Sequence, residues 1–162
     1  MKNDKIEIKV DALIKNPYSV IIKAPPQFGL TCLSHHLIIE AWNNGFLWVY
    51  LDMNKINIHI DIEKIIKKEL KKFKLENRAI DCIVLDSWKI SLTGSMKVLR
   101  GICNTFKDTP LIIMNTTGDF KLNSEQDIKI NRKFKELILS ALSRNSIRKV
   151  VSDYNTKQKY WR

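Results

Sequence analysis

The sequence predicts an α/β domain with a parallel β-sheet covered by helices on both faces. Short, largely apolar runs of four to six residues alternate with longer stretches whose apolar residues recur at helical spacing. The runs do not alternate strictly between apolar and polar residues, which is typical of strands buried on both faces. Strands of this kind separated by helices favour a parallel sheet.

Five runs are expected to be strands, and turn-forming residues bound several of them. The first run ends at Pro25-Pro26, the third ends at Asp86, and the fourth is followed by the turn-like residues 115–119. For the fifth run, periodicity alone leaves a helical turn open. The five runs are residues 19–24, 46–51, 82–85, 110–114 and 134–139.

Helical spacing marks four segments, three that follow the first three strands and one that ends the chain. The first begins after Gly29 and ends at residues 43–45, the second is capped by Asp61, and the last is capped by Ser143. Residues 120–131 are polar and irregular, so we expect a surface loop there. The expected inner faces are Leu33, Leu37, Ile38 and Ala41; Ile62, Ile65, Ile66, Leu70 and Phe73; Met96, Leu99, Ile102 or Cys103, and Phe106; and Ile147, Val150, Val151 and Tyr154.

A length of 162 residues fits a single domain. No apolar run approaches the ~18–20 residues of a membrane helix, and the N-terminus is polar rather than signal-like. Cys32, Cys82 and Cys103 are widely spaced, which favours free buried thiols in a reducing compartment. We therefore expect a cytoplasmic protein with a lead-in at residues 1–18, an α/β core at 19–142 and the start of a helical segment at 143–162.

The formal net charge of +11 comes mostly from lysine, with 22 lysines against 6 arginines. A bias of this kind throughout a chain is more typical of codon usage than of a binding surface. The densest group lies on a predicted helix opposite its apolar stripe, so a solvated helix face accounts for it. A weak, salt-sensitive surface for polyanions is the alternative. The group consists of Lys64, Lys67, Lys68, Lys71, Lys72 and Lys74.

A strand–loop–helix passage has the frame of the phosphate-binding pattern G-x-x-x-x-G-K-S/T. Residues 24–31 read A-P-P-Q-F-G-L-T. Gly29 lets the backbone approach a phosphate, and the following helix N-terminus offers free N–H groups. Thr31 is placed to ligate magnesium through its hydroxyl group. The expected phosphate-site residues are Ala24, Gln27, Phe28, Gly29, Leu30, Thr31 and Cys32.

The loop departs from the pattern at two positions. Ala24 replaces the first glycine and Leu30 replaces the lysine. One charge-assisted contact is worth ~1.5–3 kcal/mol, so its loss should weaken nucleotide binding ~10- to 100-fold. Lys23 is a candidate compensating cation, although strand parity can equally direct it elsewhere. A Pro-Pro-Gly turn can also join a strand to a helix in a protein that binds nothing.

Asp86 ends the third strand, and ligands of parallel sheets bind at the carboxyl ends of strands. This aspartate matches the acid that holds magnesium through water in nucleotide-binding domains; a helix cap or a surface turn is the alternative. Ser87 follows it, so an acid that would orient attacking water is not adjacent. We therefore expect at most a weak ATPase. Surface or packing roles are expected for His35, His36 and His59, and core positions for Trp42, Trp48 and Trp88.

In these features the chain resembles the STAND class of P-loop NTPases, the signal-transducing relatives of AAA+ proteins found in innate immunity and antiphage defence. The resemblance covers nearly the whole chain. It rests on four passages: V-I-I-K-A-P-P-Q-F-G-L-T-C-L (20–33), V-Y-L-D (49–52), I-V-L-D-S-W (83–88) and F-K-E-L-I-L-S-A-L-S-R-N-S-I-R-K-V-V-S-D-Y-N (134–155).

The resemblance implies a five-stranded sheet in the order 5-1-4-3-2, and we expect Ala24 and Asp86 to end neighbouring strands. It further implies ATP or ADP with Mg²⁺ held through Thr31 and Asp86, and sensor residues at Asn115 and Thr116. A helical domain should follow, so we expect a piece of a larger protein whose other domains are its partners. The chain departs from the pattern of this class at three positions. It lacks the lysine at 30 and the acid at 87, and it has Gly118 where an arginine often follows the threonines.

The function expected from these observations is that of a degenerate STAND-type NTPase domain. It would bind adenine nucleotide weakly, as a conformational switch with little hydrolysis. The alternative is a pseudo-NTPase protein-interaction module that binds no nucleotide and docks a partner through the same sheet edge. A basic nucleic-acid-binding domain is a weaker alternative, because lysine rather than arginine carries the charge.

Overall fold

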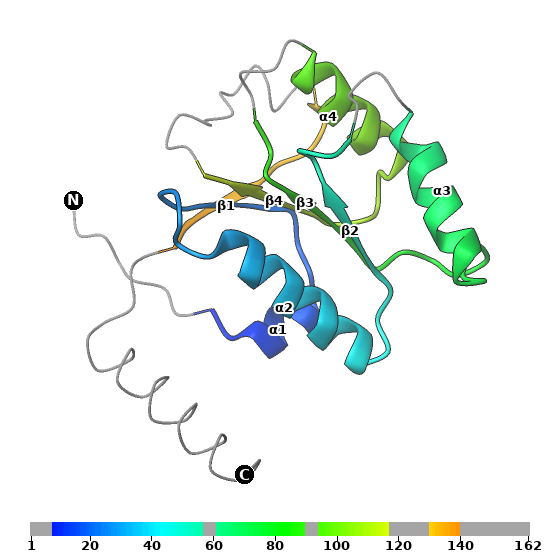
Figure 1. The fold of residues 1–162 in the computed structure, drawn as a ribbon, viewed down its shortest axis with the longest axis horizontal. Coiled ribbons are helices and arrows are strands. Elements are labelled where there is room, and N and C mark those ends of the chain that lie inside the picture. The colour runs from blue at the N-terminus through cyan, green and yellow to red at the C-terminus, as the bar shows by residue number, and fades with distance from the viewer. Residues whose placement is uncertain (1–7, 57–60, 90–93, 117–129, 140–162) are drawn as a thin grey trace, which may run out of the picture.

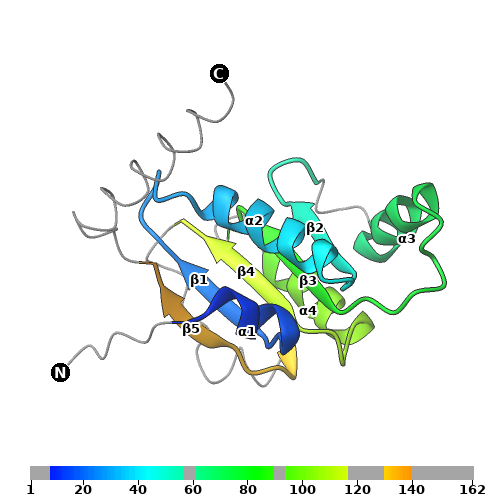
Figure 2. The same cartoon turned by 90° about the horizontal axis from the view of Figure 1, so that it is seen from below.

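A computed structural model describes residues 8–56, 61–89, 94–116 and 130–139. Its centre is a five-stranded parallel sheet in the order β2-β3-β4-β1-β5 (Figures 1 and 2). Read from the other edge, this is the predicted order 5-1-4-3-2, which is thus confirmed. The strands are β1 (Val20–Lys23), β2 (Trp48–Asp52), β3 (Cys82–Asp86), β4 (Leu111–Asn115) and β5 (Lys135–Ile138).

One detail of the predicted sheet is wrong. Strands β1 and β3 are not neighbours, because β4 pairs with both of them. The end of β4 therefore separates Ala24 from Asp86. The order 5-1-4-3-2 itself requires this separation, so the two expectations about the sheet were incompatible.

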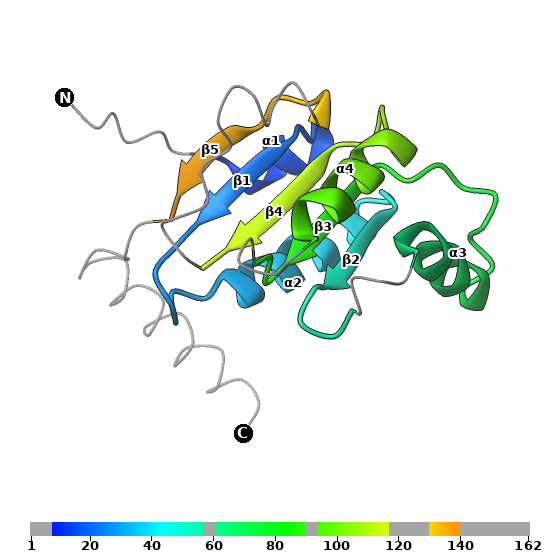
Figure 3. The same ribbon diagram turned by 90° about the horizontal axis from the view of Figure 1, so that it is seen from above.

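Helices cover both faces of the sheet. The helices α1 (Val10–Lys15) and α2 (Leu30–Asn43) lie on one face, while α4 (Ser95–Thr105) lies on the other (Figures 2 and 3). Helix α3 (Ile62–Lys72) lies beside β2, at the edge of the sheet (Figure 3). Helix α1 falls in the segment expected to be a lead-in. The sequence analysis did not predict this helix, whose buried side chains are Leu13 and Ile14.

Two apolar clusters, one on each face, form the core. Successive residues of a strand point to opposite faces, so Ile21 joins the cluster under α3 and α4 while Val20 and Ile22 join the cluster under α1 and α2. All five residues of β3 and of β4 are buried. The prediction of strands covered on both faces is confirmed for these central strands.

Two aromatic residues expected in the core are exposed instead. Trp42 is 53% exposed and Phe73 is 63% exposed, whereas Trp48 and Trp88 are buried as expected. Phe73 is the C-cap residue of α3, where the chain leaves the helix. Trp42 follows the buried Ala41 by one position, and adjacent helical residues point about 100° apart.

The basic group on α3 behaves as a solvated helix face. Ile62, Ile66 and Leu70 are buried, and the lysines of the helix lie on the exposed side. Lys67 pairs with Glu63, and Lys72 pairs with Glu69. The predicted cap is confirmed, because Asp61 Oδ1 accepts the Glu63 N–H at 3.0 Å.

Several expectations fall largely or wholly outside the described residues. They are the loop at residues 120–131, of which only the last two residues are described, and the last helix after Ser143. Among the helices that the structure describes, none has the length and apolar character needed to cross a membrane.

Candidate functional site

The loop after β1 is a tight turn that ends at the N-terminus of α2. Gln27 and Gly29 have positive φ angles of 68° and 82°. The Phe28 N–H donates to the Pro25 carbonyl at 3.3 Å, and the Leu33 N–H donates to the Gly29 carbonyl at 2.9 Å. A Cβ atom at Gly29 would meet no atom within 4 Å. The left-handed backbone, rather than a lack of space, is therefore what favours glycine at this position.

The first turn of α2 opens onto an exposed surface. An α-helix leaves its first N–H groups without helical partners, and no side chain caps α2 at Gly29. Thr31, Cys32 and residues 25–29 are all exposed. Such N–H groups, together with the helix dipole, attract an anion. The loop therefore presents main-chain N–H groups of α2 at an exposed surface.

Leu30, at the position of the missing lysine, belongs to the core. Its side chain is only 5% exposed and joins the apolar cluster that contains Ala24 and Leu37. The chain has therefore turned the cation position of the pattern into a packing position. Phe28, by contrast, is 41% exposed and does not fill the loop.

Lys23 is bound elsewhere. Its ammonium Nζ lies 2.9 Å from Glu136 Oε2 on the neighbouring strand β5, and its side chain is 8% exposed. A buried ammonium needs such a partner, because removing one member of a buried pair leaves an uncompensated charge. In this arrangement Lys23 does not supply the cation that the loop lacks.

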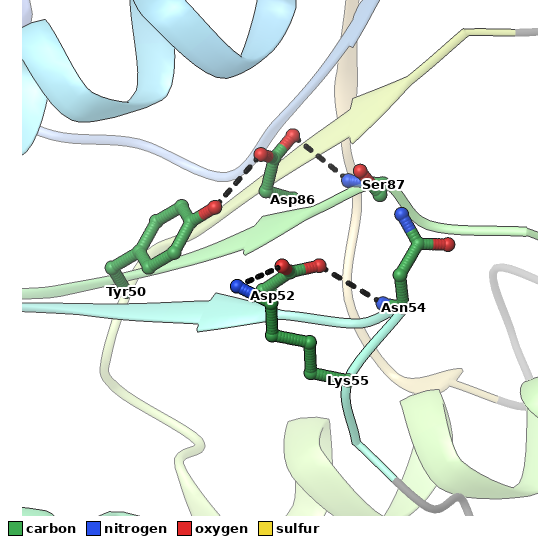
Figure 4. Close-up of polar contacts among 6 residues, drawn as sticks. All are labelled: Tyr50, Asp52, Asn54, Lys55, Asp86 and Ser87. Atoms are coloured by element: carbon green, nitrogen blue, oxygen red, sulfur yellow. Dashed lines mark hydrogen bonds and ion pairs between the residues drawn. The ribbon is translucent and has the colours of Figure 1, made fainter.

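Asp86 is buried at the end of β3, and both of its carboxylate oxygens are bonded (Figure 4). Oδ2 accepts the Tyr50 hydroxyl at 2.9 Å, and Oδ1 accepts the Ser87 N–H at 2.8 Å. Ser87 has a φ of 58°, so the chain turns directly after the aspartate. The His35 ring of α2 packs edge-on against the Tyr50 ring, with centroids 4.9 Å apart. Burial and the bond to Asp86 raise the pKa of Tyr50, so its hydroxyl keeps its proton and remains a donor.

A second carboxylate, Asp52, lies in register with Asp86 at the end of β2. Its Oδ1 accepts the Asn54 N–H at 3.0 Å, and its Oδ2 pairs with Lys55 Nζ at 3.2 Å (Figure 4). Sequence reasoning singled out neither Tyr50 nor Asp52. Their signal was available in the passage V-Y-L-D, where polar groups occupy alternate positions of an apolar strand and so share one face.

These contacts bear on whether Thr31 and Asp86 can hold a magnesium ion. The expected donors were the Thr31 hydroxyl, which is exposed, and Asp86, whose two oxygens are already bonded to Tyr50 and Ser87. Within the described ranges, no cluster of three or more histidine, cysteine or acidic side chains is arranged to hold a metal ion. Asp86 is buried and already accepts two of the about four hydrogen bonds that a carboxylate can accept, which disfavours a magnesium ion held through it in this arrangement.

The expected sensor position lies between the loop and the acid. Asn115 ends β4 and is 1% exposed. Its side-chain Nδ2 donates to the Trp88 carbonyl at 3.0 Å, and its main-chain carbonyl accepts the Ala24 N–H at 3.2 Å. Asn115 thus ties the segment after β3 to the start of the loop after β1. Thr116 is half-buried beside it.

The fold of the chain matches several solved structures, although no protein-family model and no curated protein matches its sequence. It aligns with AMPPCP-bound DnaA from Aquifex aeolicus at a TM-score of 0.60 and 17% identity, over 90% of this chain and 50% of that one. It aligns with Aeropyrum pernix Orc1 in complex with DNA at a TM-score of 0.60 and 12% identity, over 91% and 48%. A third match is the Thermotoga maritima RuvB Holliday junction branch migration motor, with a TM-score of 0.56 and 13% identity over 93% and 48%.

The chain has an AAA+-like P-loop NTPase fold. The chain spans about half the length of each of these proteins. At such low identity the likeness shows the fold alone. In this fold the loop after β1 and Asp86 at the end of β3 lie at the carboxyl ends of their strands.

Proposed function

We propose that this AAA+-like domain binds adenine nucleotide weakly, without turnover, through the main chain of the loop that joins β1 to α2. Bound nucleotide would act as a conformational signal, as the resemblance to the STAND class implies. The observation that carries the proposal is the exposed turn at Gly29, which presents uncapped N–H groups of α2. Successive N–H groups in such a turn form a concavity that suits a phosphate.

The same geometry argues against hydrolysis. The lysine position is a core position, Lys23 is paired with Glu136, and Asp86 is bonded to Tyr50. Positive groups that stabilise the transferred phosphoryl group supply most of the catalysis in phosphoryl transfer. Their absence from the loop accounts for a domain that binds without turning over.

The direct test is calorimetric titration of the full chain with ATP and with ADP, each with and without magnesium. We expect weak binding of both nucleotides, with affinities that differ little when magnesium is added. Binding that required magnesium, and that Asp86→Ala abolished, would contradict the arrangement of Asp86 described here.

A matched pair of variants locates the site. Gly29→Asp places a carboxylate at the mouth of the loop, in open space and at a φ that aspartate and asparagine tolerate best. We expect it to weaken nucleotide binding by on the order of tenfold or more. Gly29→Asn has nearly the same shape without the charge and should bind more tightly than Gly29→Asp. Gly45→Asp is the control for position, because Gly45 has the same φ of 82° and the same open space.

Turnover is a separate test. The chain should hydrolyse ATP at a rate near background. Hydrolysis at several turnovers per second (~1–100 s⁻¹ is usual for kinases), lost in Asp86→Ala, would overturn the proposal of binding without turnover.

A second candidate function is a pseudo-NTPase interaction module that binds no nucleotide. The burial of Leu30 favours it, because a core leucine stands where the fold otherwise presents a cation. Thermal unfolding with millimolar nucleotide separates the two candidates. A ligand-dependent shift supports nucleotide binding, and no shift in the parent chain or in any glycine variant supports the interaction module.

A further inference from the structure

A groove of about 500 Å³ lies between α2, α3 and the edge strand β2. This volume is within the range of ligand-binding pockets, ~300–1,000 Å³. We call it the β2-edge groove; its lining includes Ile39, Trp42, Trp48, Tyr50, Glu69, Phe73 and Arg78. The turn at Gly29 is not among its lining residues, so the groove is distinct from the proposed phosphate site.

Large apolar side chains are exposed around this groove. Ile39 is 56% exposed, Trp42 is 53% exposed and Phe73 is 63% exposed. They come from both helices, so the groove has an apolar wall on each side. Apolar residues gathered in this way, unlike single scattered ones, mark an interaction surface.

The strand at the base of the groove has an open side. Among the strands that the structure describes, β2 ends the sheet and pairs with β3 alone. Leu47 and Met53 of this segment form main-chain hydrogen bonds with Asp81 and Asp86 of the neighbouring segment. Alternate residues of a strand bond to the same side. The main-chain groups of Trp48 and Tyr50 therefore point away from β3, towards the open edge. The Trp42 indole donates to the Trp48 carbonyl at 2.9 Å. Among the described residues, the main-chain N–H and carbonyl of Tyr50 have no partner.

Charged residues of both signs line the groove, namely Arg78 and Glu69. Phe73 stands between Lys72 and Lys74 in the sequence, and Arg78 lines the groove itself. Two glutamates of α3, Glu63 and Glu69, pair with lysines of the same helix.

These observations identify the occupant by its chemistry. An edge strand with free main-chain groups binds an extended segment, whose main chain gives affinity and whose alternate side chains enter apolar pockets. We infer that the β2-edge groove binds an extended segment of a partner protein, which adds to β2 as a strand and carries apolar residues at alternate positions.

Selection from a random dodecapeptide library displayed on phage, against the immobilised full chain, tests the inference. The enriched peptides should have apolar residues at alternate positions. Enrichment of peptides with apolar residues three and four positions apart would indicate a helical occupant and overturn the inference. A failure to enrich any common pattern would also overturn it.

Two exposed isoleucines give a matched pair of variants. Ile39→Glu places a carboxylate in the groove, while Ile138→Glu makes the same change on the opposite edge strand β5, where the residue is 78% exposed. A fluorescently labelled enriched peptide should bind Ile39→Glu at least about tenfold more weakly than the parent. Its affinity for Ile138→Glu should stay within about twofold, and equal binding to both variants would overturn the inference.

Two further measurements separate strand addition from other modes. N-methylation of the labelled peptide at alternate residues removes main-chain donors, so one of the two registers should lose binding while the other keeps it. If sedimentation showed a dimer of the parent that Ile39→Glu disrupts, the occupant would be a second copy of this chain and the inference would be wrong. Because nucleotide titration addresses a different surface, either proposal can fail without the other.

Discussion

The Tyr50 hydroxyl of β2 donates a 2.9 Å hydrogen bond to Oδ2 of the buried Asp86 at the end of β3. This bond joins the edge strand to the acid that the sequence marks as the magnesium-associated residue. The Tyr50 hydroxyl thus uses one hydrogen-bond acceptor site of the Asp86 carboxylate. The His35 ring of α2 packs against the same tyrosine. The candidate site and the β2-edge groove therefore share two side chains, Tyr50 and His35.

Tyr50→Phe should lower the free energy of unfolding. The substitution removes the donor and leaves Oδ2 of a buried carboxylate without its hydrogen bond, at a cost of about 1–3 kcal/mol. Urea denaturation of both proteins near neutral pH measures the difference. An unchanged stability would mean that the bond contributes nothing net to the fold.

Alkaline pH should reduce the stability of the parent more than that of Tyr50→Phe. The pKa of Tyr50 is raised in the folded protein, first by burial and then by the bond to Asp86, while that of an unfolded tyrosine is ~10. A raised pKa means that the contribution to stability is complete below about pH 10 and is lost as the pH rises towards the folded-state value. The measurement is the difference in the free energy of unfolding between the two proteins at each pH. Both proteins contain the same lysines, so the titration of the lysines cancels in this difference. Parallel pH profiles would contradict the assignment.

Leu30→Lys should destabilise the domain without tightening nucleotide binding. The leucine side chain is 5% exposed, so a lysine there loses buried apolar contacts. The expected cost is about 1–3 kcal/mol, less than that of many Leu→Ala changes because the lysine stem keeps part of the packing. The control is Cys32→Lys, which adds the same charge at an exposed position of the same helical turn. A tenfold gain in ATP affinity for Leu30→Lys alone would show that the loop retains a place for the cation.

The ion pair between Lys23 and Glu136 should respond unequally to its two single substitutions. Lys23 is 8% exposed and Glu136 is 43% exposed. Glu136→Gln leaves a buried ammonium without its counter-ion and should cost about 1–3 kcal/mol, whereas Lys23→Met leaves a carboxylate that water can reach and should cost less. A double-mutant cycle by thermal unfolding measures the coupling. Nucleotide affinity should be the same in Lys23→Met and the parent, because this lysine does not face the phosphate site in the arrangement described.

The three thiols should differ in reactivity. Cys32 is exposed on α2, while Cys82 and Cys103 are buried. Burial raises the pKa of the Cys82 thiol and raises that of Cys103 to about 11, so neither forms much thiolate near neutral pH. A thiol reagent should therefore modify one cysteine rapidly in the native protein and all three after denaturation. Fast modification of two or three would contradict the burial.

The strands and the strand order could be predicted because they depend on local apolar runs and on a short motif. The runs at residues 82–85 and 110–114 agree with β3 and β4 to within one residue at each end. The cap at Asp61 was also readable, because a cap depends only on residues close in sequence. For the fifth run, the ambiguity between helix and strand was resolved only by its pairing with β1.

The polar contacts of the candidate site could not be predicted in the same way. Lys23 and Glu136 are far apart in sequence, and so are Tyr50 and Asp86. Each pairing depends on which strands become neighbours and on the register between them. The placement of Leu30 was open for a related reason, since a helix entry can direct this side chain towards the loop or into the core. Trp42 and Phe73 were wrongly expected to be buried. Helical spacing identifies an apolar stripe on a helix, but it does not show where the stripe leaves the core.

The burial of Leu30 also has an evolutionary consequence. A descendant of this chain that acquired a lysine at this position in one step would be less stable before it gained any use for the charge. Proteins tolerate only a limited loss of stability, so selection would remove most such descendants unless other changes had already strengthened the core. Because Leu30 is packed in the core, a lysine at this position would have to be preceded by substitutions that stabilise the core. A charged loop would therefore require several substitutions in a given order rather than one.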